Sequence, residues 1–278
     1  MAPRIPKPIL AWRYGEGHET YEIGLDEAGR GCLAGPVFAA AVVWEMPPDA
    51  SDASDAPDAL RDHPTMRLIR DSKTLSAAQR ERARAFIEAN AAAWAVGTAD
   101  AAEIDRINIL KASHAAMHRA IDLLLTKESL KESPQGIPSG IPRWGGWAIA
   151  GPGDRLAGAG RTPHLLVDGD RFRTYISPTT GDFVPHACFV EGDAKYLAIA
   201  AASILAKTHR DEHVITVMHP RHPGYAWDRN KCYGSPAHLA ALETLGVTPE
   251  HRRTFAPVRR CLEGPSIPFP ACTNPAKI

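Results

Sequence analysis

Apolar runs that stop at glycine or acidic residues predict five strands. They cover residues 21–25, 36–44, 94–97, 164–170 and 187–193. The short connection between the first two favours an antiparallel hairpin. Because helical patterns alternate with these strands, the chain is typical of an α/β fold.

Apolar positions three and four residues apart predict four helices. They cover residues 76–90, 101–125, 194–218 and 236–245. Ser76 and Gln79 have the spacing of a capping box, and we expect a helix boundary near residues 108–110. The third helix is rich in alanine and other small residues, so it can lie close against the sheet.

Two stretches without periodicity interrupt this pattern, and we interpret them as insertions. Residues 46–64 are rich in Asp, Ala and Pro, and residues 126–163 are rich in Pro, Gly and Ser. We interpret residues 1–19 as an N-terminal extension and residues 264–278, which are rich in proline, as a disordered tail. The remaining residues, 20–263, are expected to form one domain whose last part is helical.

The composition limits the partners and the cellular compartment that can be expected for the chain. Of its 278 residues, 32 are Lys or Arg and 32 are Asp or Glu, so any polyanion must be held by local basic patches. The 5 cysteines contain no Cys-x-x-Cys pair, which favours reduced thiols in the cytoplasm. No stretch approaches about 20 continuous apolar residues, and no signal-peptide core is present, so we expect no membrane segment.

Acidic residues stand at the ends of three predicted strands. Asp26 and Glu27 follow the first strand, Asp168 ends the fourth and Asp193 ends the fifth. Adjacent acids within a strand point to opposite faces, so Asp26 and Glu27 can serve one site only if the strand ends there. The turn Ala28-Gly29 is expected to end it. Sites in open α/β sheets gather at the carboxyl ends of strands, where these acids would meet.

Four carboxylates at one place would repel one another without a cation. Oxygen ligands with no supporting His or Cys point to Mg²⁺ or Mn²⁺, and two such ions about 4 Å apart favour phosphodiester hydrolysis. Simpler interpretations exist for single residues, because Asp168 suits a turn before Gly169 and Asp193 suits a helix N-cap. His114 and His118 lie one helical turn apart, which is also metal-ligand spacing, but without a third ligand we expect solvent-facing or core-edge histidines.

Nine motifs together resemble bacterial ribonuclease HII. The first is Gly24-Leu25-Asp26-Glu27-Ala28-Gly29-Arg30-Gly31, and the last is His251-Arg252-Arg253-Thr254-Phe255. The others lie between them in the order of the family, within residues 33–37, 71–75, 107–110, 167–169, 192–193, 201–207 and 231–234. One motif would be weak, but the ordered set spans about residues 21–262 and is specific.

The resemblance implies a ribonuclease H-like fold, with a mixed central five-stranded sheet flanked by helices and a helical C-terminal part. It implies an endonuclease that cuts the RNA strand of RNA/DNA hybrids and incises duplex DNA on the 5′ side of embedded ribonucleotides. The products would carry 3′-hydroxyl and 5′-phosphate ends, as in ribonucleotide excision repair and primer removal. The catalytic, metal-binding residues would be Asp26, Glu27, Asp168 and Asp193, with Mn²⁺ or Mg²⁺ as the cofactor.

The resemblance also implies substrate-binding residues. The turn of Gly29, Arg30 and Gly31 would sense the ribose 2′-hydroxyl, the group that distinguishes RNA from DNA, and Tyr233 would stack on the neighbouring deoxyribose. Lys73 is a candidate phosphate ligand, with a surface lysine as an equal alternative. Further candidates, on one helix face with Arg210, are Ser203 and Lys207, which a polar helix edge explains nearly as well.

Some features leave the interpretation open. Arg252 and Arg253 suit backbone phosphates or surface acids equally. Cys232 stands where glycine is common in the family, which leaves the shape of the loop around Tyr233 undecided. The two insertions are longer than those of a minimal family member. They interrupt loops and no motif, so they affect what is expected of substrate docking or protein partners and leave the expected chemistry unchanged. We expect a monomer, and a sliding-clamp contact through the proline-rich tail stays open.

Three other functions compete with this one. A ribonuclease HIII-like hybrid nuclease would share the fold and the acids, but that family normally has an extra N-terminal domain and lacks the Gly-Arg-Gly turn. A non-catalytic nucleic-acid-binding module would use the acids to hold a structural ion. A two-metal phosphatase would have no use for Tyr233 or for ribose discrimination.

Overall fold

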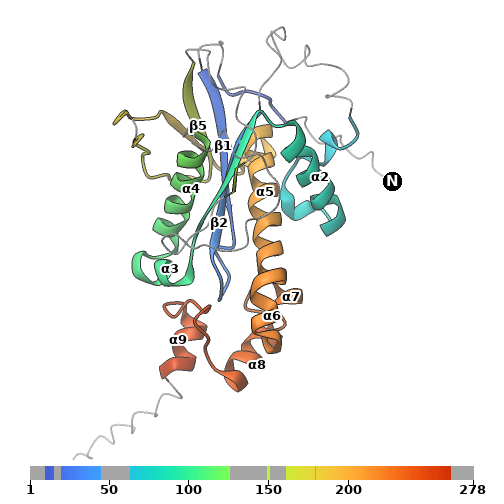
Figure 1. Cartoon of the computed structure of the whole chain (residues 1–278), viewed down its shortest axis with the longest axis vertical. Coiled ribbons are helices and arrows are strands. Elements are labelled where there is room, and N and C mark those ends of the chain that lie inside the picture. The colour runs from blue at the N-terminus through green and yellow to red at the C-terminus, as the bar shows by residue number, and fades with distance from the viewer. Residues whose placement is uncertain are drawn as a thin grey trace, which may run out of the picture.

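The computed structural model gives the arrangement of most of the chain (Figure 1). It describes residues 10–15, 20–44, 63–125, 149–150, 161–178 and 180–263. Most of the two predicted insertions and the whole of the predicted tail lie outside these residues. Part of the predicted extension is described, and there Trp12 is buried in the core while Ala11 pairs with Tyr196.

Within the described residues, six strands form one mixed sheet in the order β4-β3-β2-β1-β5-β6. They are β1 (Thr20–Ala28), β2 (Val37–Val43), β3 (Ala93–Ala99), β4 (Ile149–Ala150), β5 (Thr162–Asp168) and β6 (His186–Phe189). Strands β1, β2 and β3 are antiparallel neighbours, whereas β5 runs parallel to both β1 and β6. The five predicted strands and the hairpin are confirmed. The predicted insertion at 126–163 is wrong at two points, because it contains β4 and the first two residues of β5.

The four predicted helices are present with corrected ends, and the helices at residues 219–221, 227–230 and 256–263 were not predicted. The α-helices are α2 (Ala77–Asn90), α3 (Ala101–Ile107), α4 (Ile109–Leu125), α5 (Leu197–His213), α6 (His219–Arg221), α7 (Trp227–Asn230), α8 (Pro236–Leu245) and α9 (Ala256–Glu263). The predicted capping box is confirmed, since Ser76 and Gln79 bond to each other's backbone N–H. The predicted boundary is also confirmed, because Asn108 has a φ of 70° and separates α3 from α4. None of the described helices has the length and apolar character needed to cross a bilayer.

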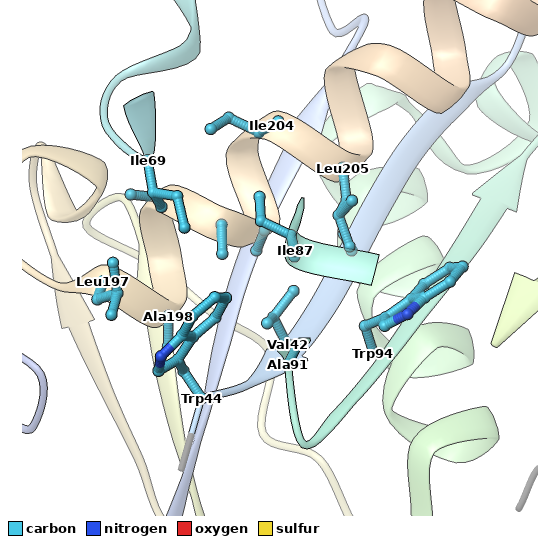
Figure 2. Close-up of a cluster of buried hydrophobic side chains, with 14 of the residues drawn as sticks. Val42, Trp44, Ile69, Ile87, Ala91, Trp94, Leu197, Ala198, Ile204 and Leu205 are labelled. Atoms are coloured by element: carbon cyan, nitrogen blue, oxygen red, sulfur yellow. The ribbon is translucent and has the colours of Figure 1, made fainter. Parts of the chain in front are cut away.

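Helices cover both faces of the sheet. In Figure 1, α4 lies on one side of the strands, and α5 and α2 lie on the other. On the α5 side, a buried cluster joins helix and sheet residues such as Val42, Ile87 and Leu205 (Figure 2). A second cluster lies between the sheet and α4, around Ile23, Met117 and others. Burial of these apolar faces supplies the main stabilisation of the sheet.

A third cluster builds the C-terminal helical part. It joins α7, α8 and α9 to the segment that follows the glycine turn, with Trp227 and Cys32 fully buried. The segment is held between two others, because Cys32 pairs with Tyr233 and Ala34 pairs with His251. The glycine turn and the C-terminal part therefore form one packed unit.

Gly24 sets the distance between β1 and α5. A Cβ atom added at Gly24 would lie 2.2 Å from the carbonyl carbon of Ala198 and 2.5 Å from the nitrogen of Ile199. Neither backbone atom can move alone, since both belong to α5. The prediction that small residues bring this helix close to the sheet is confirmed, with a glycine on the strand completing the contact.

We expect Gly24→Ala to destabilise the protein by about 1–3 kcal/mol, because α5 must move away from β1. The midpoint of thermal unfolding should fall by about 2–12 °C. Gly31→Ala is the matched control, because an added Cβ there meets no atom within 4 Å. Equal melting temperatures for the two variants would contradict this account of the contact.

Candidate active site

The structure brings all four predicted acids together at or just after the carboxyl ends of β1, β5 and β6. The pairing of β1 with β5 ends at Leu25 and Val167, one residue before Asp26 and Asp168. The first strand was expected to end at Leu25. This is wrong on the side of β1 that faces β2, where the pairing continues to Ala28. Both acids of β1 are therefore held by β2 but lie beyond the last pair with β5.

Asp168 and Asp193 are connected through the backbone. Oδ1 of Asp168 accepts a hydrogen bond from the backbone N–H of Gly192 at 2.8 Å. Asp193 lies in the 3₁₀ turn η3 (Gly192–Ala194), three residues ahead of the N-cap of α5, which is Tyr196. Asp193 is therefore not the N-cap of the long helix, so the simpler interpretation of this residue is wrong.

The acids carry negative charge that the described residues compensate only in part. Burial, followed by the charges of Glu27 and Asp168, holds the pKa of Asp26 well above its ordinary value. Burial also raises the pKa of Glu27, against the lowering effect of Arg30. The pKa of Asp193 is raised by burial and then by the charges of Asp168 and Asp71. Each carboxylate would release its proton more easily with a cation beside it.

Two basic side chains and one hydroxyl lie beside these acids. Nη1 of Arg30 is 3.0 Å from Oε1 of Glu27, and the charge of Lys73 lowers the pKa of Glu27 and Asp193. The Ser203 side chain lies beside Asp26 and lowers the pKa of that carboxyl, and its hydroxyl shares a hydrogen bond with Ser72 at 3.0 Å. Because Ser203 is only 5% exposed, the structure favours it as a support for Asp26 over direct contact with a substrate.

The donor set fits a hard divalent cation. It consists of carboxylate oxygens from three segments, with Asp26 and Asp193 buried. Across the part of the chain that the structure describes, no three His, Cys, Asp or Glu side chains already form a coordination shell. Glu27 is instead turned to Arg30. The chemistry of the residues is therefore suitable, and the side chains must converge on the ion when it binds.

The turn between β1 and β2 needs glycine for two different reasons. Gly29 has a φ of 95°, and an added Cβ would lie 3.1 Å from Nε of Arg210. Gly31 is exposed, and its surroundings leave a Cβ in open space, so only a partner from outside would exclude a side chain there. The turn is fixed from below by Arg252, which donates to the carbonyls of Arg30 and Gly35 at 2.9 Å.

Arg252 therefore does not contact backbone phosphates. It is fully buried, so both uses considered for it from the sequence are wrong. The adjacent Arg253 donates its backbone N–H to Asp105 at 2.8 Å. The His-Arg-Arg motif was the only sequence signal for this support, and it did not show which carbonyls the guanidinium would reach.

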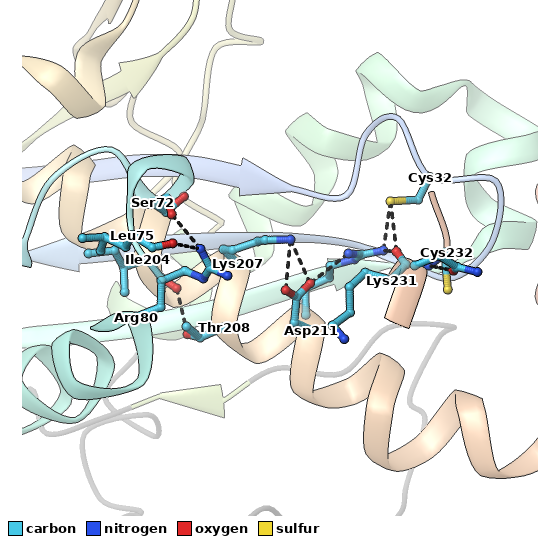
Figure 3. Close-up of polar contacts among 12 residues, drawn as sticks. Cys32, Ser72, Leu75, Arg80, Ile204, Lys207, Thr208, Asp211, Lys231 and Cys232 are labelled. Carbon is cyan, nitrogen blue, oxygen red and sulfur yellow. Dashed lines mark hydrogen bonds and ion pairs between the residues drawn. The ribbon is translucent and has the colours of Figure 1, made fainter. Parts of the chain in front are cut away.

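Tyr233 lies next to the glycine turn with 43% of its surface exposed. Nζ of Lys207 is 5.5 Å and the guanidinium of Arg210 is 5.3 Å from the centre of its ring. Asp211 holds both cations, at 3.0 Å from Lys207 and 2.9 Å from Arg210, and this polar network continues to Cys32 and Lys231 (Figure 3). An aromatic surface beside two cations suits a nucleic-acid strand.

Cys232 keeps a backbone shape that glycine adopts more easily. Its φ is 63° and that of Lys231 is 50°, both in the left-handed region. A glycine at this position would adopt the same backbone conformation at a lower steric cost.

His114 and His118 are partly buried residues at the edge of the core, which is one of the two expected placements. Both rings contact Phe172, and His118 also bonds to the carbonyl of Arg173 at 2.8 Å. They hold the loop that follows Asp168. Among the described residues, Cys32, Cys188, Cys232 and Cys261 are free thiols.

Comparisons with known proteins agree with this geometry. The family model of ribonuclease HII matches residues 23–135 and 161–258. Ribonuclease HII of Bacteroides fragilis is 42% identical over 247 residues, which cover 89% of this chain and 93% of that protein. Ribonuclease HII of Porphyromonas gingivalis is 42% identical over 234 residues, covering 84% of this chain and 88% of that protein.

Solved structures show the same fold. The ribonuclease H2 of Pyrococcus horikoshii has a TM-score of 0.55 at 22% identity, covering 88% of this chain and 98% of its own. The ribonuclease HII of Archaeoglobus fulgidus, solved in complex with PCNA, has a TM-score of 0.52 at 19% identity, covering 84% and 95%. The fold is ribonuclease H-like, and the chain belongs to the ribonuclease HII family of endonucleases.

Proposed function

We propose that this endonuclease incises duplex DNA on the 5′ side of embedded ribonucleotides and cuts the RNA strand of RNA/DNA hybrids. The products carry 3′-hydroxyl and 5′-phosphate ends. The observation that carries the proposal is the pairing of Cys32 with Tyr233. It sets an open glycine backbone and an exposed aromatic ring side by side, close to the edge that carries the four acids.

Each part of the site has a distinct role in the proposal. Asp26, Glu27, Asp168 and Asp193 hold Mn²⁺ or Mg²⁺, which when bound supplies Lewis-acid activation of water and stabilises charge on the phosphate. The backbone at Gly31 hydrogen-bonds the ribose 2′-hydroxyl, where a side chain would block the approach. Arg30 and Lys73 attract the phosphates on either side. Ser203 keeps Asp26 oriented.

Tyr233 contacts the nucleotide that follows the ribonucleotide. Its ring packs against a deoxyribose, which has no 2′-hydroxyl to be displaced, while Lys207 and Arg210 hold the other side of the ring. The chain would therefore favour a junction between one ribonucleotide and DNA. A cytoplasmic monomer and a sliding-clamp contact through residues 264–278 remain predictions, and that segment lies outside the described residues.

We expect Asp168→Asn and Asp193→Asn each to lower the rate of cleavage by about 100-fold or more, because each removes a charge from the cation site. The affinity for the substrate duplex should stay within about threefold, since phosphate contacts come from other residues. Single-turnover rates and binding by fluorescence anisotropy measure the two effects. Asp170→Asn is the control, because Asp170 is exposed next to the site. Full activity in either site variant would remove the site assignment.

Tyr233→Ala should lower kcat/KM on a duplex with one ribonucleotide about tenfold, which corresponds to about 1.4 kcal/mol of lost stacking. Cleavage of a uniform RNA/DNA hybrid should change less, because it offers no junction with DNA. Tyr233→Phe keeps the ring and should retain most of the preference for the junction. Equal ratios of the two substrates for wild type and Tyr233→Ala would refute this role.

Asp26→Asn should stabilise the metal-free protein while it abolishes cleavage. A raised carboxyl pKa means that the native state binds the proton more tightly, so this contribution to stability is lost as pH rises through the raised pKa. At neutral pH the uncharged amide removes that cost, and the melting temperature in chelator should rise by about 2–4 °C. Added Mn²⁺ should then stabilise the wild type more than the variant.

The exposed Asp182→Asn serves as the control in the same melting experiment, and it should leave both temperatures unchanged. A lower melting temperature for Asp26→Asn in chelator would contradict the view that burial beside Glu27 and Asp168 makes the charged form of Asp26 destabilising.

A further inference from the structure

The loop that carries Tyr233 has a backbone that its residues do not favour. Lys231 and Cys232 are consecutive residues in the left-handed region, which side chains other than glycine rarely adopt. Such a conformation persists only where the surroundings hold it. The contacts of Tyr233 therefore decide where its exposed ring stands.

His238 holds the main chain of Tyr233. Nδ1 of His238, on α8, lies 2.9 Å from the carbonyl oxygen of Tyr233, which also accepts the backbone N–H of Ser235 at 2.8 Å. The imidazole is completely buried. A buried side chain that bonds a backbone carbonyl has one geometry, so it can set the direction of that peptide.

The direction of this hydrogen bond follows from Trp227. Its indole N–H can only donate, and it lies 3.0 Å from Nε2 of His238, which must accept. A neutral imidazole that accepts at Nε2 carries its proton on Nδ1. His238 therefore donates that proton to the carbonyl of Tyr233.

His251 adds one residue to this series of hydrogen bonds. The backbone N–H of Thr248 donates to Nδ1 of His251 at 3.0 Å, which leaves the proton of this ring on Nε2. That nitrogen is 3.2 Å from Nε2 of His238. Burial lowers the pKa of His251 to about 4 and also lowers that of His238, which keeps both rings neutral near pH 7. Nε2 of His238 has one lone pair, which the N–H groups of Trp227 and His251 therefore share, and this three-centre contact connects Thr248 through the two histidines to Tyr233.

The same residues border the segment behind the glycine turn. Tyr233 pairs with Cys32, and His251 pairs with Ala34. The chain of hydrogen bonds therefore spans the two segments on either side of residues 32–34. These contacts connect the peptide of Tyr233 with the segment that follows Gly31.

We propose that His238 and His251 are positioning residues, which fix Tyr233 relative to the glycine turn and so set the preference for a single embedded ribonucleotide over a uniform hybrid. This inference rests on the proposed function, because it assigns a cause to the preference. Neither histidine contacts the substrate in this account. Both act through the peptide of Tyr233.

Four amide variants test the direction of the chain. At His238, Asn keeps a donor near the place of Nδ1, whereas Gln puts its amide near Nε2 and leaves Tyr233 without this bond. At His251 the order is reversed, because Gln keeps a donor toward His238 and Asn keeps only the acceptor for Thr248. A change of volume alone would rank Asn and Gln in the same order at both positions.

The measured quantity is the ratio of kcat/KM for a DNA duplex with one ribonucleotide to that for a uniform RNA/DNA hybrid. His238→Gln and His251→Asn should lower this ratio about tenfold, since a small displacement of a substrate-positioning group has large kinetic effects. His238→Asn and His251→Gln should keep it within about threefold of the wild-type value. Melting temperatures and cleavage of the uniform hybrid show that each variant is folded.

Two results would overturn the inference alone: an unchanged ratio in His238→Gln, or the same order of Asn and Gln at both positions. A wild type that cuts neither substrate would instead overturn the proposed function. Should the variants fail to fold, NMR of the wild type can show which ring nitrogen of each histidine carries the proton. The proposal requires a proton on Nδ1 of His238 and on Nε2 of His251, and the opposite tautomer at His238 would refute it.

Discussion

The close contact of α5 with β1 at Gly24 is the constraint on which the rest of the structure depends. It brings the backbone of Ala198 to the strand. About one and a half helical turns further along α5, Ser203 lies beside Asp26. The turn before the same helix delivers Asp193, and its later residues deliver Lys207 and Arg210 to Tyr233. One helix thus links the acids with the aromatic surface, so the spacing between the proposed cleavage site and the proposed recognition site follows from a packing distance.

The second constraint is electrostatic. Asp26 and Asp193 are buried near other carboxylates, which raises the pKa of both. A protein built for stability alone would not place charges this way, because buried charge without a partner costs free energy. Under the proposed function a bound cation offsets this cost, and the pair of Arg30 with Glu27 shows how one acid is neutralised without it. In the proposed function, activity at the carboxyl ends of these strands is therefore gained at the expense of stability.

Local patterns in the sequence were sufficient for the strands, the capping box at Ser76 and the break at Asn108. Strand ends were harder, because β1 continues past Leu25 on the side of β2 and stops on the side of β5. The motif order indicated the family, and the placement of acids at strand ends indicated where they meet. These features depend on neighbours in the sequence or on regular strand geometry.

Long-range partners could not be predicted. Arg252 bonds the carbonyls of Arg30 and Gly35, more than two hundred residues away, and its sequence gives no sign that it is buried. His238 and His251 likewise look like ordinary polar residues of a helix and a loop, and only the fold brings their rings together. Such supports depend on tertiary packing and follow no local period.

Cleavage of a DNA duplex with one internal ribonucleotide tests the central claim most directly. The strand that contains the ribonucleotide is end-labelled, Mg²⁺ or Mn²⁺ is added, and an all-DNA duplex and a chelator serve as controls. The account predicts a single metal-dependent cut on the 5′ side of the ribonucleotide. Cleavage of a long RNA/DNA hybrid without this cut would contradict the roles of the glycine turn and Tyr233, and no cleavage of either substrate would contradict the proposed function as a whole.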